Sequence, residues 1–281
     1  MRWGVDTYSF HRYLGEVYPM QKQPQKQWDY IKLIEELISM GAEGLSVETC
    51  FLSGPGDPLY QEIRDLCRKN SIEMIMAWGH PMGLYGGTDE TALQDMISYI
   101  PLCADLGIKT MRIVGSNRRL MQAIPKVEQI EGVRKYLKIA APIAEEYQVT
   151  LAIENHQDFL AGDLLYILES IGSKFLGVNY DSGNSLRLNE DPVKAAELLG
   201  SWIKAVHIKD VKINKESDPG EWIYWSCVPA GKGKVALKEL VETIETAGFS
   251  GVYAIELDCM HPDYPDEMTA VSESLAFLRN L

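Results

Sequence analysis

The chain has 281 residues, of which 46% are hydrophobic and 24% charged, and its formal net charge is −13. This composition is typical of a soluble globular protein, and the acidic balance disfavours a nucleic-acid partner because it repels phosphodiester backbones. No long apolar run, basic amphipathic helix, lipidation motif or signal peptide indicates membrane attachment or export, so we expect a cytoplasmic protein. The five cysteines include no CxxC pair, which favours reduced thiols over a disulfide framework.

Strand-type and helix-type segments alternate along the whole chain. Short apolar runs predict eight strands, at Trp3–Tyr8, Gly44–Val47, Ile72–Trp78, Thr110–Val114, Leu151–Ile153, Phe175–Tyr180, Ile203–Ile208 and Val252–Leu257. Helical spacing and capping signals predict the helices, at Gln27–Met40, Pro58–Lys69, Glu90–Leu106, Val127–Tyr147, Gly162–Ile171, Pro192–Gly200, Leu237–Ala247 and Asp266–Leu278. Eight alternating units predict parallel strands in one closed (β/α)8 TIM barrel, a single domain over residues 1–281. An open doubly wound sheet is the alternative, but no GxGxxG motif follows the first strand.

Polar residues close four consecutive predicted strands. Glu154 follows the run LAI, Asp181 follows GVNY, and His207 and Glu256 lie near the ends of the last two strands. A buried carboxylate is costly unless something pairs with it, and the carboxyl ends of barrel strands converge on one pocket. Three carboxylates and one imidazole suit a divalent cation such as Mn²⁺ or Mg²⁺. We therefore predict a site for one cation, and the alternative is four unrelated buried polar residues.

The histidines all lie outside the predicted helices and mark a polar, proton-handling pocket. His156 is two residues past Glu154, on the same side of an extended chain, and is a candidate acid or base. His11 and His80, which follow the first and third strands, are candidate substrate-binding residues. Each could instead be a structural histidine.

Three more residues are candidate contacts for a substrate. Glu48 ends the second strand and could bond a sugar hydroxyl or orient a metal ligand, whereas Asp6, within the first strand, is expected to be structural. Asn184 lies shortly after the sixth strand and could bond a hydroxyl or cap its loop. Lys209 could stabilise an oxyanion, or it could pair with Asp210 or a neighbouring carboxylate.

Two long segments, Leu14–Gln25 and Val211–Lys234, are predicted to be irregular. The second contains Trp222 with two further aromatic residues, which could cover a sugar ring, pack the loop down or form a subunit contact. Its last four residues, GKGK, could bind a phosphate at the start of the next helix or simply lead into that helix.

These motifs carry a resemblance to a known family. The IEN-type fifth strand, DSGN after the sixth, HIKD after the seventh and IELD on the eighth resemble the sugar phosphate isomerase/epimerase family of the xylose isomerase-like TIM barrel superfamily. The resemblance implies a Mn²⁺-type ion on Glu154, Asp181, His207 and Glu256. In the ketose 3-epimerases of this group, the two Glu ligands also move the proton on opposite faces of the sugar.

The resemblance implies an enzyme that acts on a small carbohydrate. The first hypothesis is an isomerase or epimerase that removes a proton next to a carbonyl and passes through an enediolate, with Glu154, Glu256 and His156 as catalytic residues. The second is a lyase, either a dehydratase or a C-glycoside-cleaving enzyme, because related epimerases have an Arg where this chain has Ile213 and because HxKD resembles the dehydratase branch. A barrel that binds metal and sugar without turnover is the third.

The cofactor implied is one divalent cation. Mn²⁺ is the first choice, and Mg²⁺, Co²⁺ and Zn²⁺ are alternatives. The acidic balance argues against the DNA repair endonuclease branch of the superfamily. The sequence is compatible with a homo-oligomer and with a hetero-oligomer, and it does not define the substrate.

Overall fold

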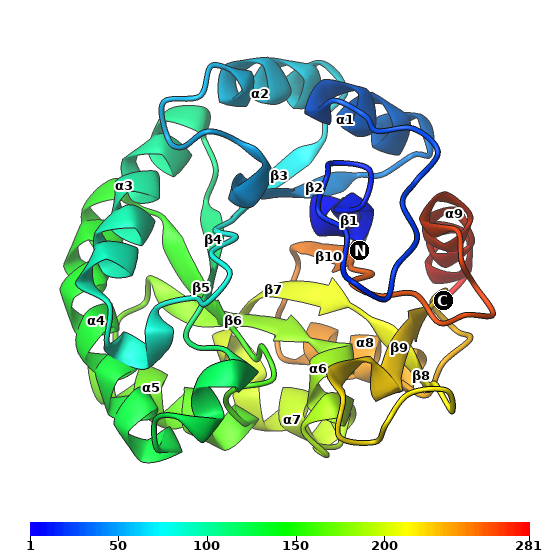
Figure 1. Ribbon diagram of the computed structural model, residues 1–281. Coiled ribbons are helices and arrows are strands. Elements are labelled where there is room, and N and C mark those ends of the chain that lie inside the picture. The colour runs from blue at the N-terminus through cyan, green and yellow to red at the C-terminus, as the bar shows by residue number, and fades with distance from the viewer.

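The computed structural model describes residues 1–281, and its parallel strands close into the predicted TIM barrel (Figure 1). The barrel strands are β1 (Arg2–Asp6), β2 (Gly44–Glu48), β3 (Glu73–Ala77), β4 (Thr110–Val114), β5 (Thr150–Glu154), β6 (Leu176–Asp181), β7 (Ile203–Ile208) and β10 (Val252–Ile255). Their order around the barrel is β1-β10-β7-β6-β5-β4-β3-β2, so strands next to one another along the chain are also neighbours in space.

The α-helices form a ring outside the strands (Figure 1). They are α1 (Tyr30–Ser39), α2 (Leu59–Lys69), α3 (Glu90–Leu106), α4 (Lys126–Tyr147), α5 (Ala161–Ile171), α6 (Ser182–Arg187), α7 (Pro192–Leu199), α8 (Leu237–Thr246) and α9 (Glu267–Leu278). Gly107 ends α3 and Gly172 ends α5 at φ values of 79° and 71°, a left-handed conformation that glycine adopts without strain. None of these helices combines the length and the apolar character needed to cross a bilayer.

Predicted boundaries differ from the observed ones by up to three residues, and the last strand ends at Ile255 rather than at Leu257. At two other boundaries an aspartate side chain accounts for the difference. The first strand stops at Asp6, whose carboxylate accepts the N–H of Tyr8 at 2.7 Å and starts a 3-10 turn. The first helix begins at Tyr30, since the carboxylate of Asp29 caps it by accepting the N–H of Lys32 at 2.7 Å. The first of these shifts places the Asp6 side chain at the carboxyl end of the barrel.

The segment Val211–Lys234 is more regular than predicted. It contains most of an antiparallel hairpin made of β8 (Asp210–Ile213) and β9 (Trp225–Val228), joined through the 3-10 turn η6 (Trp222–Tyr224). The short helix α6 was also not predicted, and it begins where Asp181 Oδ1 accepts the N–H of Asn184 at 2.8 Å. Both elements lie on the side of the barrel where the candidate ligands gather.

The apolar core has two parts. The larger cluster includes residues from the strands and from the helices that cover them. A separate cluster of small or β-branched side chains comes from β3, β5, β7 and β10, and consists of Ile75, Ala152, Ala205, Val252 and Ala254. Gly44 leaves room here, because a Cβ on it would lie 2.5 Å from the Val252 side chain. Apolar side chains therefore fill this part of the barrel interior, and the polar candidate ligands lie at the strand ends.

Candidate metal centre

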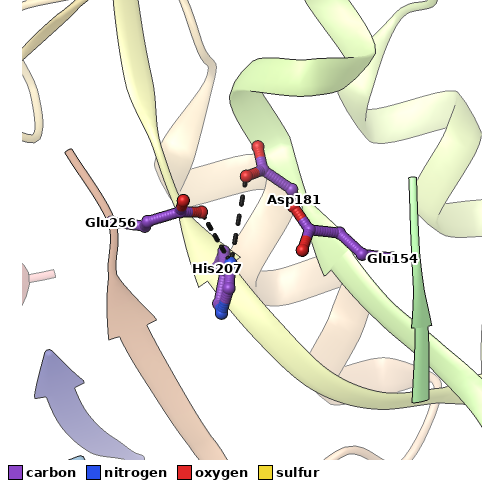
Figure 2. Close-up of side chains that lie close together, drawn as sticks. All are labelled: Glu154, Asp181, His207 and Glu256. Atoms are coloured by element: carbon purple, nitrogen blue, oxygen red, sulfur yellow. Dashed lines mark hydrogen bonds and ion pairs between the residues drawn. The ribbon is translucent and has the colours of Figure 1, made fainter. Parts of the chain in front are cut away.

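The four predicted ligands lie together. Glu154 and Asp181 are the last residues of β5 and β6, His207 is next to last in β7, and Glu256 directly follows β10. All four are buried, and one ligand atom from each lies within 4.8 Å of the others (Figure 2). Because these strands are neighbours in the barrel, their ends can all reach one point. The spatial convergence expected from the sequence is therefore confirmed.

The donor set fits a divalent cation. The Nδ1 atom of His207 faces the carboxylates, at 2.7 Å from Glu256 Oε2 and 4.0 Å from Asp181 Oδ2. Asp181 Oδ2 is buried and accepts no well-aligned hydrogen bond, although it forms an ion pair with Lys209. A buried carboxylate oxygen in that position has a lone pair free for an ion.

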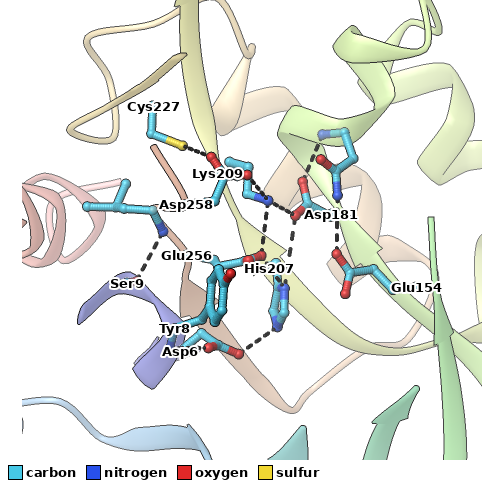
Figure 3. A network of polar contacts seen from close by, with 12 residues as sticks. Asp6, Tyr8, Ser9, Glu154, Asp181, His207, Lys209, Cys227, Glu256 and Asp258 are labelled. Atoms are coloured by element: carbon cyan, nitrogen blue, oxygen red, sulfur yellow. Dashed lines mark hydrogen bonds and ion pairs between the residues drawn. The ribbon is translucent and has the colours of Figure 1, made fainter. Parts of the chain in front are cut away.

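The carboxylate of Asp6 holds the other side of the His207 ring. Its Oδ2 atom lies 3.2 Å from His207 Nε2, and its side chain is fully buried. Although burial opposes the charge, Glu256 and Asp6 raise the pKa of His207 well above its ordinary value. His207 would hold a cation through the nitrogen that faces the carboxylates, in place of a proton, and Asp6 would keep the other proton on Nε2. Asp6 was expected to be structural, and its carboxylate contacts the ring of a candidate ligand (Figure 3).

Arg112 on β4 joins Glu48 to the ligand set. Its Nε atom is 2.6 Å from Glu154 Oε2, and its Nη2 atom is 3.1 Å from Glu48 Oε1. The other Glu154 oxygen, Oε1, accepts a hydrogen bond from Asn184 Nδ2 at 3.1 Å. The Asn184 side chain thus contacts a candidate ligand, whereas the cap of α6 is the Asp181 carboxylate, which accepts the backbone N–H of Asn184. Sequence reasoning missed Arg112. A charged residue inside a buried strand could have indicated it, because an unpaired buried charge is costly and such a residue therefore needs a partner of opposite charge.

Lys209 lies among three carboxylates (Figure 3). Its Nζ atom is 2.8 Å from Asp181 Oδ2, 3.1 Å from Glu256 Oε2 and 3.1 Å from Asp258 Oδ2. Asp258 also binds both terminal nitrogens of Arg187, at 2.5 and 2.9 Å. Although burial opposes ionisation, Arg187 and Lys209 hold the pKa of Asp258 well below its usual range. Of the two expected roles of Lys209, pairing with neighbouring carboxylates is the one that these contacts support.

Asp210 does not pair with Lys209. Its carboxylate accepts the backbone N–H groups of Gly231, Gly233 and Val235 at 2.9, 2.8 and 3.1 Å. These amides belong to the GKGK run and the residue after it, which was considered as a phosphate site. The chain's own carboxylate already occupies the position that a phosphate would take, so the phosphate interpretation is wrong for this loop.

A cavity of about 1220 Å³ opens beside the ligands. Among the residues that line it are Glu48, His80, Arg112, His156, Trp222 and Glu256. His11, Asn184 and Lys209 do not line this cavity, and the two ring nitrogens of His11 lie 2.7 and 2.8 Å from the backbone oxygens of Glu16 and Asp258. Of the predicted catalytic and substrate-binding residues, the cavity therefore brings together Glu48, His80, His156, Trp222 and Glu256, whereas His11, Glu154, Asn184 and Lys209 do not line it.

Two loops meet at the mouth of the cavity. Trp222 contacts the edge of Tyr18 with ring centroids 5.4 Å apart, and the Arg187 guanidinium lies 5.5 Å from the centre of the same indole ring. Arg118, which also lines the cavity, donates a hydrogen bond to the Gly220 oxygen. Of the aromatic residues in the predicted irregular segment, Trp222 faces the cavity, whereas Tyr224 and Trp225 do not line it. No cysteine forms a disulfide.

Comparison of the sequence with known proteins finds one matching family model and several curated relatives. The xylose isomerase-like TIM barrel family model matches residues 34–281. The chain is 26% identical over 158 residues to the 3-oxo-isoapionate decarboxylase of Pectobacterium atrosepticum, a match that covers 56% of this chain and 55% of that protein. It is 27% identical over 168 residues to the L-ribulose-5-phosphate 3-epimerase of Salmonella paratyphi A, which covers 59% and 55%. The chain thus spans about half the length of these curated relatives.

Among solved structures, a D-tagatose 3-epimerase-like protein has the same fold. The TM-score is 0.74 at 17% sequence identity, and the alignment covers 100% of this chain and 96% of that one. At this identity the likeness describes architecture alone. The family model, by contrast, covers most of the sequence, including all four candidate ligands. The chain belongs to the xylose isomerase-like TIM barrel family.

Proposed function

We propose that this enzyme is a divalent-metal-dependent isomerase or epimerase of a sugar or a related polyol. The observation that carries the proposal is the convergence of Glu154, Asp181, His207 and Glu256 within 4.8 Å, next to a cavity large enough for a carbohydrate. The sugar-phosphate epimerase among the relatives supports a small carbohydrate as the substrate. Mn²⁺ suits three oxygens and one imidazole nitrogen best, with Mg²⁺, Co²⁺ and Zn²⁺ as alternatives.

When bound, the ion would polarise substrate oxygens and stabilise the negative charge that develops next to a carbonyl. Glu256 is the ligand that lines the cavity, and its contacts with His207 and Lys209 both involve Oε2, which leaves Oε1 for the substrate. It is therefore the candidate base that removes the proton, and the resulting enediolate is reprotonated to give an isomer or an epimer. Glu154 is the second carboxylate that the family resemblance implies for proton transfer.

His156 is the alternative acid or base. Burial lowers its pKa, so the neutral imidazole predominates, and its buried Nδ1 atom has no hydrogen-bond partner. A neutral imidazole that lines the cavity can accept a proton from a substrate hydroxyl. Around it, Glu48 and His80 would contact sugar hydroxyls, and Trp222 would cover one face of the ring.

A screen in deuterated water tests the proposal. Ketoses, inososes and 3-keto-glycosides are incubated with the protein and Mn²⁺, and products are read by mass spectrometry and proton exchange. We expect at least one sugar to gain deuterium while its composition stays the same. Strong chelation should abolish turnover, and added Mn²⁺ should restore it. Activity that is indifferent to both treatments would remove the ion from the mechanism.

A lyase is the second candidate. The residue six positions beyond His207 is Ile213, at the end of β8, where related epimerases have an Arg according to the family resemblance. One relative is named as a 3-oxo-isoapionate decarboxylase, which supports a reaction that releases part of the substrate. In the same screen, a product lighter by water or by carbon dioxide would favour the lyase. Binding of ion and sugar without any exchange would favour a barrel without turnover.

A further inference from the structure

The ammonium group of Lys209 lies among carboxylate oxygens beside the candidate ligands (Figure 3). Its Nζ atom is 2.8 Å from Asp181 Oδ2, 3.1 Å from Glu256 Oε2 and 3.1 Å from Asp258 Oδ2. Asp181 and Glu256 are candidate ligands, whereas Asp258 is not one of the four. Carboxylate oxygens are also the ligands that hard divalent cations prefer. The ammonium group therefore occupies a position that would suit a second cation.

Asp181 and Glu256 face both Lys209 and the histidine of the ligand set. The oxygens that contact Lys209, Asp181 Oδ2 and Glu256 Oε2, are also 4.0 Å and 2.7 Å from His207 Nδ1. In sites that hold two metal ions, the ions lie about 3.5 to 4 Å apart, so that they can share carboxylate ligands. Two carboxylates that each face an imidazole on one side and a cationic group on the other are placed as such shared ligands would be.

The lysine is held in this position from its backbone outward. Its N–H donates to Ser182 Oγ at 2.9 Å, and the same hydroxyl donates to the Lys209 carbonyl oxygen at 3.0 Å. Gly183 makes room for the aliphatic part of the side chain, because a Cβ on residue 183 would lie 2.7 Å from Lys209 Cγ. Lys209 is buried and does not line the cavity. Its charge is therefore fixed beside the ligands and does not face a substrate.

Asp258, the third carboxylate around the ammonium group, is held by other donors of the chain. Its Oδ1 atom accepts the backbone N–H of Cys259 at 2.6 Å and the thiol of Cys227 at 3.1 Å. Arg187 donates to both of its oxygens, at 2.5 and 2.9 Å. With these contacts the carboxylate keeps Oδ2 directed at Lys209. The three oxygens thus stay together around one positive charge.

We propose that Lys209 takes the place of a second metal ion and keeps this centre mononuclear, an inference that rests on the proposed function. An ammonium group brings one positive charge and binds carboxylates, whereas a second divalent ion would bring two charges and could also bind a substrate oxygen. A pair of ions suits in-line displacement, because it stabilises the attacking and the leaving oxygen together. A single ion suits proton transfer next to a carbonyl. Lys209 is therefore a positioning residue for Asp181 and Glu256, and it restricts the class of reaction.

The experiment counts bound Mn²⁺ in the full chain by equilibrium dialysis and elemental analysis, and it needs no substrate. It compares the wild type with Lys209→Ala, which vacates the space of the side chain, and with a control, Lys212→Ala. Lys212 also pairs with an aspartate, Asp263, at 2.8 Å, but in an exposed ion pair away from the ligands. We expect one ion per chain in the wild type and in Lys212→Ala, and two ions in Lys209→Ala. Electron paramagnetic resonance should show isolated Mn²⁺ in the first two proteins and a magnetically coupled pair in Lys209→Ala.

A single ion in Lys209→Ala would overturn the inference, as would two ions in the wild type at the same free Mn²⁺ concentration. Adding Asp258→Asn to Lys209→Ala should return the count to one, because the second ion loses a charged ligand. Lys209→Ser should give the same count as Lys209→Ala, and both should fold in excess Mn²⁺, since the second ion replaces the lost positive charge. Failure of both to fold under that condition would also overturn the inference. A wild type that binds no Mn²⁺ would refute the proposed metal centre and this inference with it, whereas one ion in both proteins would refute only the role of Lys209.

Discussion

Replacing Asp6 by Asn should weaken binding of the cation without disturbing the fold. The Asn side chain can keep the cap, because its oxygen can still accept the N–H of Tyr8, which Asp6 accepts at 2.7 Å. Its NH₂ group would then face His207 Nε2, which lies 3.2 Å from Asp6 Oδ2. Two donors cannot share that space, so the ring proton is driven to Nδ1, the atom that the cation needs.

The size of the expected loss in Mn²⁺ affinity follows from the position of Asp6, which would orient the ligand His207. Removing such a partner weakens metal affinity by about 10-fold to 100-fold, which corresponds to about 1.4 to 2.8 kcal/mol of binding free energy. Full burial of Asp6 places the effect toward the upper end, since water cannot replace the carboxylate. Isothermal calorimetry with Mn²⁺, in competition with a chelator of known affinity, measures the change.

A matched control is available in the same chain. Asp29 caps α1 through the N–H of Lys32 at 2.7 Å, but it is exposed and makes no contact with the ligands. Asp29→Asn should therefore leave Mn²⁺ affinity unchanged while making the same chemical substitution at a cap. If Asp6→Asn binds Mn²⁺ as tightly as the wild type, the assignment of the His207 tautomer to Asp6 is refuted.

Three further predictions concern the residues around the ion. Glu154→Gln and Glu256→Gln should both keep the fold, seen by circular dichroism, and lose turnover; full activity in either variant would reject its double role as ligand and proton carrier. Lys209→Met should lower the free energy of unfolding by about 3 kcal/mol in the absence of metal, because it leaves buried carboxylates uncompensated, and Mn²⁺ should raise its Tm more than that of the wild type. Equal free energies of unfolding in denaturant for Lys209→Met and the wild type would contradict this. Trp222→Ala should raise KM for the sugar by about fivefold, the equivalent of about 1 kcal/mol of aromatic contact, with little change in kcat; an unchanged KM would place the indole outside the substrate site.

The barrel and the convergence of the ligands could be predicted because both follow from local rules. Alternation of apolar strands and helices leaves few topologies, and in a parallel barrel the carboxyl ends of the strands meet at one face. Glu154, Asp181, His207 and Glu256 each stand at or next to such an end. Their proximity was therefore accessible from position alone, without knowledge of any pairwise contact.

The supporting contacts could not be predicted, because each joins strands that are distant in the sequence. Arg112 reaches Glu154 across 42 positions, and Asp6 reaches His207 across 201. If Asp6 had been recognised as the end of its strand, the sequence would have placed it near the ligands. Its partner, His207, could still not have been identified, because that contact depends on which strands are neighbours in the closed barrel. The hairpin of β8 and β9 was missed because a single residue, Lys209, separates β7 from β8 and because the apolar pattern of β8 is short.

In the loop that leads into α8, a carboxylate of the chain itself binds the backbone amides that could otherwise bind an anion. Three backbone amides converge on the Asp210 carboxylate, at 2.8 to 3.1 Å. A substrate that bears a phosphoryl group would have to place it elsewhere on the rim, so free sugars belong in any search for the physiological compound as much as their phosphorylated counterparts. Shortening the side chain at residue 210 would leave these donors without an acceptor and create a receptor for inorganic sulfate or phosphate where the native molecule has none.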